Sequence, residues 1–315
     1  MKAAVVTAYG EPAVVRVAER SQPQAGKGGI VVRAKAAAVT SADARIRAAR
    51  FPKGFGLPAR MAFGIRNPRR AVLGSAFSGM VEQVGAGVHG LNVGDEVCGM
   101  TGLSLGAHAE LVAVDAGRVV AKPSLVSHDD AAGVLFGGTT ALHFLRDKAQ
   151  VLPGMSVLVN GASGAVGTNA VQLARAMGAQ VTAVTSAANA ALAAQLGAAS
   201  VINYEREPLA ELHRRFDVVL DTVGNLNIAT ARDLLTGGGV AVLAVATLGE
   251  TLRARGNVVA GSAPERPSDF TELLARVAQG ELSVIIDEIY SLDDIVEAHR
   301  RVDSQRKVGN ILIHP

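Results

Sequence analysis

Residues 157–186, VLVNGASGAVGTNAVQLARAMGAQVTAVTS, constrain the fold of this chain more than any other segment. A short apolar run, Val157–Asn160, precedes a glycine-rich turn at 161–167. Apolar residues then recur at helical spacing up to Gly178, a residue typical of a helix C-terminus, and a second apolar run follows at Val181–Val184. The pattern predicts a strand, a turn, a helix and a parallel strand, which is the repeating unit of an α/β fold.

The turn carries a glycine triplet at the spacing of a dinucleotide-binding fingerprint, namely Ala162, Gly164 and Gly167, with the first glycine relaxed to alanine. The middle glycine lets a pyrophosphate approach the backbone at the helix N-terminus, and the last one lets helix and strand pack closely. Glycines also mark ordinary turns, but a triplet inside a complete strand–helix–strand unit is specific. We therefore expect the chain to bind a dinucleotide.

The end of the second strand indicates which dinucleotide binds. NAD-binding proteins usually carry Asp or Glu about 20 residues after the motif, where the carboxylate holds the ribose 2′-hydroxyl. Here the segment at 185–189 reads TSAAN, and the next acidic residue is Glu205. A carboxylate would repel a 2′-phosphate, whereas hydroxyl and amide groups would not, so the sequence favours NADPH over NADH. The segment holds no arginine or lysine, so the predicted preference is modest.

Composition indicates a globular protein without a nucleic-acid partner. The 315 residues suffice for one large or two ordinary domains, and the formal net charge is only +3. The densest basic stretch, Arg60–Arg70, is interpreted as a solvated loop, because tryptophan is absent and aromatic residues total 3%.

Cysteine and histidine usage predicts a cytoplasmic protein without a metal. The single cysteine, Cys98, excludes an internal disulfide and fits a reducing compartment. The start, MKAAVVTAYGEP, is too short an apolar run for a signal peptide, and no stretch approaches the roughly 18 apolar residues of a membrane span. Zinc sites need three or four protein ligands, and the seven histidines show no paired spacing. We expect neither zinc nor membrane association.

Three parts follow one another along the chain. Residues 1–123 carry short β-type runs between glycine turns and predict a small barrel-like domain, whereas residues 124–262 alternate strands and helices around a parallel sheet. Residues 263–315 hold too few elements for a domain and are expected to return to the N-terminal part. The expected strands are Ile30–Lys35, Gly79–Val84, Asp95–Gly99, Ala109–Val114, Val201–Asn203, Asp217–Asp221, Gly239–Ala246 and Asn310–His314, and the expected helices are Ile228–Leu235, ended by Gly237–Gly239, Ser268–Gln279 and Leu292–Asp303.

Seven segments spread over nearly the whole chain occur in a highly specific order and spacing. They are LGSAFSGMVEQVGAGVHGLNVGDEVCG at 73–99, GAHAELVAV at 106–114, GGTTALHFL at 137–145, VLVNGASGAVG at 157–167, LGAASVINY at 196–204, FDVVLDTVG at 216–224 and IVEAHRRVDSQRKVGNILI at 295–313. In this order they resemble the zinc-free quinone oxidoreductase (zeta-crystallin-like) branch of the medium-chain dehydrogenase/reductase superfamily. The resemblance implies a GroES-like β-barrel catalytic domain, a Rossmann doubly wound parallel sheet that binds NADPH, and an active-site cleft between them.

The resemblance also implies a set of cofactor-binding residues. Those matching the phosphate-binding turn are Ser163, Gly164, Ala165, Val166 and Gly167, and those matching the adenosine ribose and 2′-phosphate site are Ser186 and Tyr204. Those matching the nicotinamide site are Thr140, Leu243, Ala244, Val245, Ala246, Gly261, Ser262 and Ala263, with Lys307 where the C-terminal segment passes the cofactor. Tyr204 could instead cap a strand, and Thr140 could bond its own helix backbone.

Two positions depart from the family pattern. Ala76 stands in LGSAFSG where relatives often carry an acid, which agrees with a metal-free site. The segment VTSAD at 39–43 replaces an asparagine-proline-x-aspartate pattern, so Thr40, Asp43 and Arg45 are candidate polar residues of the substrate pocket. The alternative is an Asp43–Arg47 pair at i, i+4. The rest of the pocket is expected around 40–55, 61–63 and 247–255.

The expected chemistry is hydride transfer to an activated carbon. Without zinc, alcohol oxidation has no obvious Lewis acid, whereas reduced nicotinamide can reduce a quinone or the β-carbon of an enone. The sequence therefore predicts an NADPH-dependent reductase of such small molecules, with a biosynthetic enoyl reductase or a catalytically weak NADPH-binding regulatory protein as alternatives. No general acid stands out, and His143 is interpreted as a helix-packing residue. Family dimers join two Rossmann sheets, so we expect a homodimer through residues 237–248.

Overall fold

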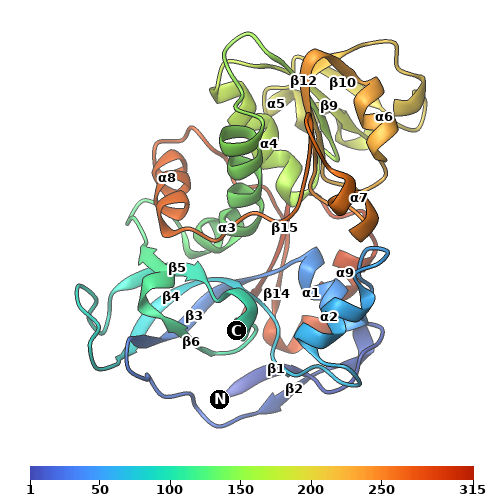
Figure 1. Ribbon diagram of the computed structural model, residues 1–315. Coiled ribbons are helices and arrows are strands. Elements are labelled where there is room, and N and C mark those ends of the chain that lie inside the picture. The colour runs from blue at the N-terminus through green and yellow to red at the C-terminus, as the bar shows by residue number, and fades with distance from the viewer.

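Two large β-sheets lie at opposite ends of the computed structural model, which describes residues 1–315, and helix α3 (His128–Leu142) lies between them (Figure 1). The first sheet has seven strands in the order β14-β15-β3-β4-β5-β7, and β6 pairs with β3. Its strands are β3 (Gly29–Val39), β4 (Ala76–Val84), β5 (Glu96–Met100), β6 (Leu111–Asp115), β7 (Val119–Ala121), β14 (Ile286–Ser291) and β15 (Asn310–His314); β1 (Lys2–Val6) and β2 (Val15–Glu19) form a separate hairpin.

The second sheet is parallel throughout, and its six strands run in the order β10-β9-β8-β11-β12-β13. In chain order this is 3-2-1-4-5-6, the arrangement of a doubly wound dinucleotide-binding sheet. Its strands are β8 (Ser156–Asn160), β9 (Gln180–Thr185), β10 (Ser200–Asn203), β11 (Phe216–Asp221), β12 (Leu235–Leu243) and β13 (Val258–Ala260). The predicted fold class, a GroES-like β-barrel plus a Rossmann sheet, is confirmed.

Helices cover the sheets and the space between them (Figure 1). None is long and apolar enough to cross a bilayer. Besides α3 they are α1 (Ser41–Ala48), α2 (Gly56–Phe63), α4 (Ala165–Ala176), α5 (Ala190–Gln195), α6 (Ile228–Asp233), α7 (Leu248–Arg253), α8 (Pro267–Ala278) and α9 (Ile295–Asp303).

Most predicted elements appear within a few residues of their expected bounds, but the glycine run does not act as predicted. Gly237–Gly239 lies inside β12, which begins at Leu235, instead of ending α6 before a strand. Pairing with β11 overrides the weak strand propensity of glycine, and the register shifts between Phe216 and Val218. A Cβ on Gly239 would lie 2.8 Å from the Phe216 carbonyl oxygen, so the bulge requires glycine there.

The C-terminal segment joins the first sheet, since β15 pairs antiparallel with β3 at residues 37–39 and parallel with β14. The predicted helix at 292–303 is divided into a 3₁₀ turn, Leu292–Asp294, and α9. The division of the chain at residues 123 and 262 stays a prediction.

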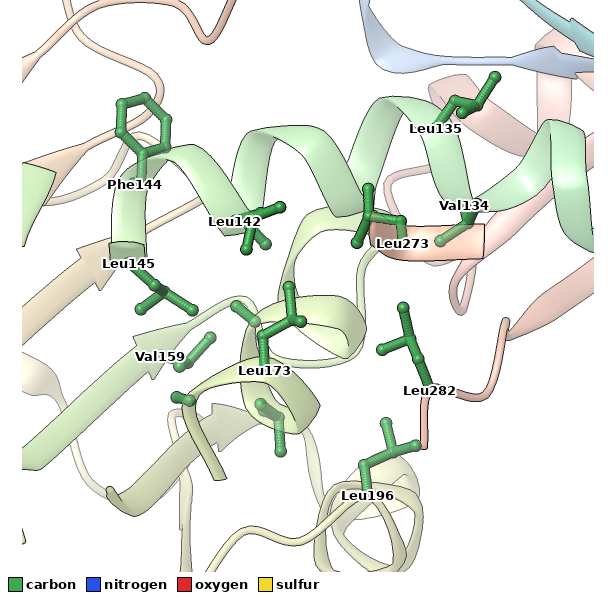
Figure 2. Packing of buried hydrophobic residues seen from close by; sticks show 14 of the residues in the cluster. Val134, Leu135, Leu142, Phe144, Leu145, Val159, Leu173, Leu196, Leu273 and Leu282 are labelled. Carbon is green, nitrogen blue, oxygen red and sulfur yellow. The ribbon is translucent and has the colours of Figure 1, made fainter. Parts of the chain in front are cut away.

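Helix α3 is the centre of the largest hydrophobic core, a cluster of 35 buried residues. Figure 2 shows Val134, Leu142 and Leu145 of this region facing Val159 of β8, Leu173 of α4 and Leu273 of α8. The same cluster contains Ala36 and Cys98 from the first sheet. One continuous apolar core therefore joins the two sheets through α3.

A smaller core under α9 contains a histidine without hydrogen bonds. His299 has no exposed surface, and neither ring nitrogen has a partner. Its ring packs edge-on against His108 at 5.9 Å between centroids, and His108 bonds the Ala38 carbonyl through Nε2. Burial is the main cause that lowers the pKa of His299 well below its ordinary value, and the nearby His108 and Arg47 lower it further.

We expect His299 to make the protein less stable in mild acid. The folded state keeps the ring neutral, whereas the unfolded chain takes up a proton below about pH 6.5. The unfolded state then binds more protons, so the free energy of unfolding falls by up to about 1.4 kcal/mol per pH unit below that value. Urea unfolding between pH 5 and pH 8 checks this.

The variant His299→Leu isolates this contribution. It should flatten the pH dependence below about pH 6.5, while His89→Leu, at an exposed site, should leave the slope of the parent protein. Equal slopes for the His299 variant and the parent would assign the acid sensitivity to other groups.

Candidate active site

The cleft lies at the switch point of the parallel sheet, where β8 and β11 are neighbours but their connections leave in opposite directions. Ligands of such sheets bind outside the carboxyl ends of the strands at this point. Gly161 follows β8, and Thr222 and Val223 follow β11; all three line a cavity of about 390 Å³, here called the phosphate-side cavity.

The three glycines of the turn after β8 have different roles. Gly161 has φ +82°, and a Cβ there would lie 2.5 Å from Thr222 Oγ1. A Cβ on Gly167 would lie 2.1 Å from the Gly161 carbonyl oxygen, so this position serves helix–strand packing. On Gly164 the nearest atom is the Gly161 oxygen at 3.5 Å, and the residue lines the phosphate-side cavity. The missing side chain at Gly164 therefore leaves space for a ligand, whereas at Gly161 and Gly167 it leaves space for neighbouring atoms of the protein.

The N-terminus of α4 supplies groups that fit a dinucleotide phosphate. No side chain caps this helix, and its first residues, Ala165 and Val166, line the phosphate-side cavity. The first N–H groups of a helix lack acceptors within the helix and attract anions. The donor set of this chain therefore fits the diphosphate of a nicotinamide cofactor.

The C-terminal segment closes the other side of this turn. The Gly309 N–H donates to the Ser163 carbonyl (2.8 Å), and Lys307, which lines the cavity, donates from Nζ to the Gly309 carbonyl. Burial lowers the pKa of Lys307 to about 8. A nearby phosphate would favour the charged form of this lysine.

Asp221 holds the loop after β11 in place. Its carboxylate has no exposed surface and accepts hydrogen bonds from the N–H groups of Val223, Gly224 and Leu226 and from Asn160 Nδ2. Burial outweighs these bonds and raises the pKa of the Asp221 carboxyl. The motif FDVVLDTVG therefore positions one wall of the cleft.

Two further cavities, of about 590 and 570 Å³, adjoin the phosphate-side cavity. We call the first the inner cavity and the second the apolar pocket. Phe136 lines both the phosphate-side and the inner cavity, and Ala244 and Ser262 line both the inner cavity and the apolar pocket. The apolar pocket contains Phe51 and Phe63, whose rings stack at 5.9 Å with 8° between planes. The predicted pocket segments thus meet in one place.

The structure brings many predicted site residues to these cavities, but not all of them. Thr40, Gly164, Ala165, Val166 and Lys307 line the phosphate-side cavity; Asp43, Thr140 and Ala263 the inner cavity; Ala244, Gly261 and Ser262 the inner cavity and the apolar pocket; Val245 and Ala246 the apolar pocket. Ser163, Gly167, Ser186, Tyr204 and Leu243 line none of them, and Leu243 is fully buried in β12.

Ser186 and Tyr204 lie next to each other at the carboxyl ends of β9 and β10. Thr185 and Asn203 are register partners in the sheet, and the Tyr204 N–H donates to the Thr185 carbonyl at 3.3 Å. Tyr204 is 53% exposed and Ser186 is half-buried, so both residues keep accessible surface beyond the phosphate-side cavity. Their use by a cofactor stays a prediction.

Thr140 bonds its own helix, as the alternative interpretation proposed, and still lines the inner cavity. Its hydroxyl donates to the Phe136 carbonyl at 2.7 Å, four residues earlier in α3. The hydroxyl hydrogen is therefore engaged, and the oxygen is left to accept a hydrogen bond from a ligand.

The Asp43–Arg47 pair, the alternative to a pocket role, is wrong. Asp43 is buried and forms a capping box with Thr40 at the start of α1, and its Oδ1 accepts the Gly74 N–H at 2.9 Å. Arg47 instead donates to the Asp303 carboxylate and to the Gly10 carbonyl. Both groups have distant partners that a local i, i+4 rule does not include.

His143 belongs to a charged cluster outside the cleft. It is buried, its Nδ1 lies 3.0 Å from Asp147 Oδ2, and it lines none of the three cavities. Arg146 and Arg266 bind the same carboxylate. They hold the pKa of Asp147 well below its usual range, and the hydrogen bond from Arg146 has the largest effect. This environment agrees with the interpretation of His143 as a packing residue.

Phe136, which lines two cavities, was missed in the sequence. It immediately precedes the GGTTALHFL segment, and its place four residues before Thr140 puts both on one side of α3. That spacing was the available signal. Asn310 and Gln305 also line the phosphate-side cavity, but no sequence pattern pointed to them.

Comparisons with known proteins follow the same division of the chain. A family model described as alcohol dehydrogenase GroES-like domain matches residues 26–124, and one described as zinc-binding dehydrogenase matches residues 196–313. Although the second description names zinc, the chain has no group of three or more His, Cys, Asp or Glu residues that could hold a metal ion. Cys98 is buried in β5, and burial raises the pKa of its thiol to about 12. The residues present do not fit a zinc site.

Relatives that align over nearly the whole chain show to which family the protein belongs. A 2-methylene-furan-3-one reductase of Solanum lycopersicum is 30% identical and aligns with 100% of this chain and 79% of that protein. A quinone oxidoreductase of Pseudomonas aeruginosa is 29% identical over 98% of both chains. Among solved structures, the quinone oxidoreductase from Coxiella burnetii is similar with a TM-score of 0.90 at 26% identity, covering 100% of this chain and 99% of that one.

The Escherichia coli quinone oxidoreductase complexed with NADPH is similar over 100% of both chains, with a TM-score of 0.85 at 25% identity. Sequence and structure thus agree over the full length of the protein. The chain belongs to the medium-chain dehydrogenase/reductase superfamily, in its quinone oxidoreductase branch, and is an oxidoreductase.

Proposed function

We propose that this protein uses NADPH to reduce quinones or α,β-unsaturated carbonyl compounds by hydride transfer, without a metal. The observation that carries the proposal is the meeting of an uncapped helix N-terminus and an apolar pocket in one cleft that lacks a cluster of metal ligands. The relatives named for quinone and furanone reduction support the substrate class, and the NADPH-bound neighbour supports the cofactor.

In this proposal the chain binds the cofactor from the carboxyl ends of β9 and β10 through the three cavities. The Ala165 and Val166 N–H groups and Lys307 bind the diphosphate, and Ser186 and Tyr204 contact the adenosine ribose and its phosphate. Thr140 and the segments 244–246 and 261–263 would hold the nicotinamide. Bound NADPH supplies a hydride.

The remaining task of the protein is to position the acceptor. The aromatic walls of the apolar pocket exclude water, and holding two reactants in contact alone accelerates a reaction strongly. Ser262 has no hydrogen-bond partner within the protein and lines both the inner cavity and the apolar pocket, so its hydroxyl can donate to an oxygen that becomes negative. Solvent completes protonation.

A biosynthetic enoyl reductase is the second candidate. A region of the polyketide synthase GfsB of Streptomyces halstedii is 32% identical over 78% of this chain, which is 5% of that protein. The reaction at the reacting carbon would be the same, and only the substrate would differ.

Turnover measurements test the function. NADPH oxidation should occur with quinones or enones and should persist after exhaustive chelation. Tight NADPH binding without turnover on a broad panel of both classes would instead favour a regulatory protein, and loss of activity together with stoichiometric zinc would reject the metal-free assignment.

Gly164 and Gly167 of the turn should respond differently to substitution. Gly164→Ala places a methyl group in the free space of the cavity, so the variant should melt like the parent and bind NADPH at least about tenfold more weakly, the equivalent of 1.4 kcal/mol. Gly167→Ala would force a Cβ to 2.1 Å from a carbonyl oxygen and should lower the melting temperature. Thermal melts and calorimetric titration check both. Normal NADPH affinity in the Gly164 variant would contradict the phosphate site.

Ser186 should control the choice of cofactor. Ser186→Asp adds an acceptor for a ribose hydroxyl and repels a 2′-phosphate, so it should shift the ratio of NADPH to NADH affinity toward NADH by about tenfold or more. Calorimetry with both cofactors measures the ratio, and Ser186→Asn controls for size without the charge. Equal or tighter binding of NADH by the parent protein would contradict the proposed preference.

The assembly and location belong to the same proposal. A homodimer through residues 237–248 is supported by the short edge strand β13, which pairs only with residues 241–243 and leaves the start of β12 without a partner on that side. Light scattering tests the dimer. A cytoplasmic location rests on the single cysteine.

A further inference from the structure

One arginine of the cleft has no partner within the protein. Arg45 lies in α1, is half-buried, and forms neither a hydrogen bond nor an ion pair. Arg47, two residues later on the same helix, is buried against Asp303 and the Gly10 carbonyl, and Arg50 is paired with Glu11. The capping box of Thr40 and Asp43 fixes the start of this helix and hence the position of the Arg45 backbone.

Arg45 is the only charged residue that lines the apolar pocket. The other residues there include Phe51, Phe63, Ala244 and Ser262, and none carries a carboxylate. Burial lowers the pKa of Arg45, and no charged neighbour offsets this effect. A guanidinium held in such surroundings stays charged and gains most from an anionic partner.

The nearby carboxylates are already engaged. Asp303 lines the phosphate-side cavity with Arg45 but binds Arg47. Glu250, which lies with Arg45 in a small cavity that shares lining residues with the apolar pocket, accepts hydrogen bonds from the Thr247 N–H and hydroxyl. The protein therefore leaves the anion to a ligand.

The ligand anion could belong to the cofactor or to the substrate. The phosphate-side cavity already offers Lys307 and the N-terminus of α4 to the cofactor phosphates. The apolar pocket, in contrast, offers no other charge, and it lies beside the segment 244–246 where the proposed hydride transfer takes place. The substrate is the better match.

We propose that Arg45 binds a carboxylate or similar anionic group of the substrate, so that the enzyme prefers enones with an apolar body and one negative charge. This inference rests on the proposed function and names the substrate class of that site. A forked guanidinium matches a carboxylate with two parallel hydrogen bonds. Bound in this way, the anionic end fixes the orientation of the double bond against the nicotinamide.

A pair of matched substrates tests the inference: 3-benzoylacrylate and its neutral methyl ester, which share the reacting double bond. The parent protein should show the higher kcat/KM for the acid. In Arg45→Gln the ratio of acid to ester kcat/KM should fall about tenfold to a hundredfold, mostly through the KM of the acid, as expected for loss of one charge-assisted hydrogen-bonded pair. Arg45→Lys should retain much of the ratio, and Arg50→Gln, whose partner is Glu11, should keep it.

Binding measurements separate this inference from the proposed function. Calorimetric titration of the saturated acid, 3-benzoylpropionate, into the protein with NADP⁺ should show weaker binding to Arg45→Gln than to the parent, whether or not the parent turns over. If no compound of the quinone and enone panel is reduced, the two benzoylacrylates included, the proposed function fails. If the ester is reduced as well as the acid and Arg45→Gln changes neither the ratio nor the binding, the inference fails alone. A weaker NADPH affinity with an unchanged ratio would assign Arg45 to the cofactor phosphates and overturn it.

Discussion

The close approach of α3 and α4 determines the geometry of the whole cleft. A Cβ on Gly137 of α3 would lie 2.3 Å from the Ala165 carbonyl oxygen, so only glycine allows the two helices to touch at this point. Ala165 opens α4 and lines the phosphate-side cavity, and α3 carries Phe136 and Thr140 on the same side. One glycine therefore sets the distance between the phosphate end of the cleft and the walls near the reacting atoms.

Charge and polarity are separated along the cleft. The phosphate end is built from backbone N–H groups and the buried Lys307. These donors are stabilised by a bound diphosphate. The other end is lined by aromatic and small side chains, apart from one arginine. A ligand that spans both ends must itself be polar at the phosphate end and mainly apolar at the other, which restricts what this cleft accepts before any specific contact is considered.

Local sequence patterns predicted most elements but few of the side-chain contacts. The unit β8–α4–β9 was readable because its periodicity, turn and helix C-terminus all lie within 30 residues, and Gly178 indeed follows α4 with φ +83°. The strand conformation of Gly237–Gly239 depends on pairing with β11. The partner of Arg47, Asp303, lies 256 residues away in the sequence. Neither can be derived from neighbours in the chain. The site residues themselves came from a whole-chain resemblance, and the burial of Leu243 and the unpaired state of Arg45 needed three-dimensional contacts.

The position of β15 has a consequence for the order in which the chain can fold. Residues 311–313 pair with residues 37–39 of β3, whereas β6 pairs with residues 29–33. The edge of β3 at residues 37–39 therefore stays open until the end of the chain is synthesised. The strands of the parallel sheet all lie between residues 156 and 260, and its most distant pairing joins Val157 to Val218. All its strands are therefore synthesised before β15, and the sheet can form first. An unpaired strand edge is a template for wrong pairing. The first sheet is thus the last to be completed and the part of the nascent protein most exposed to aggregation.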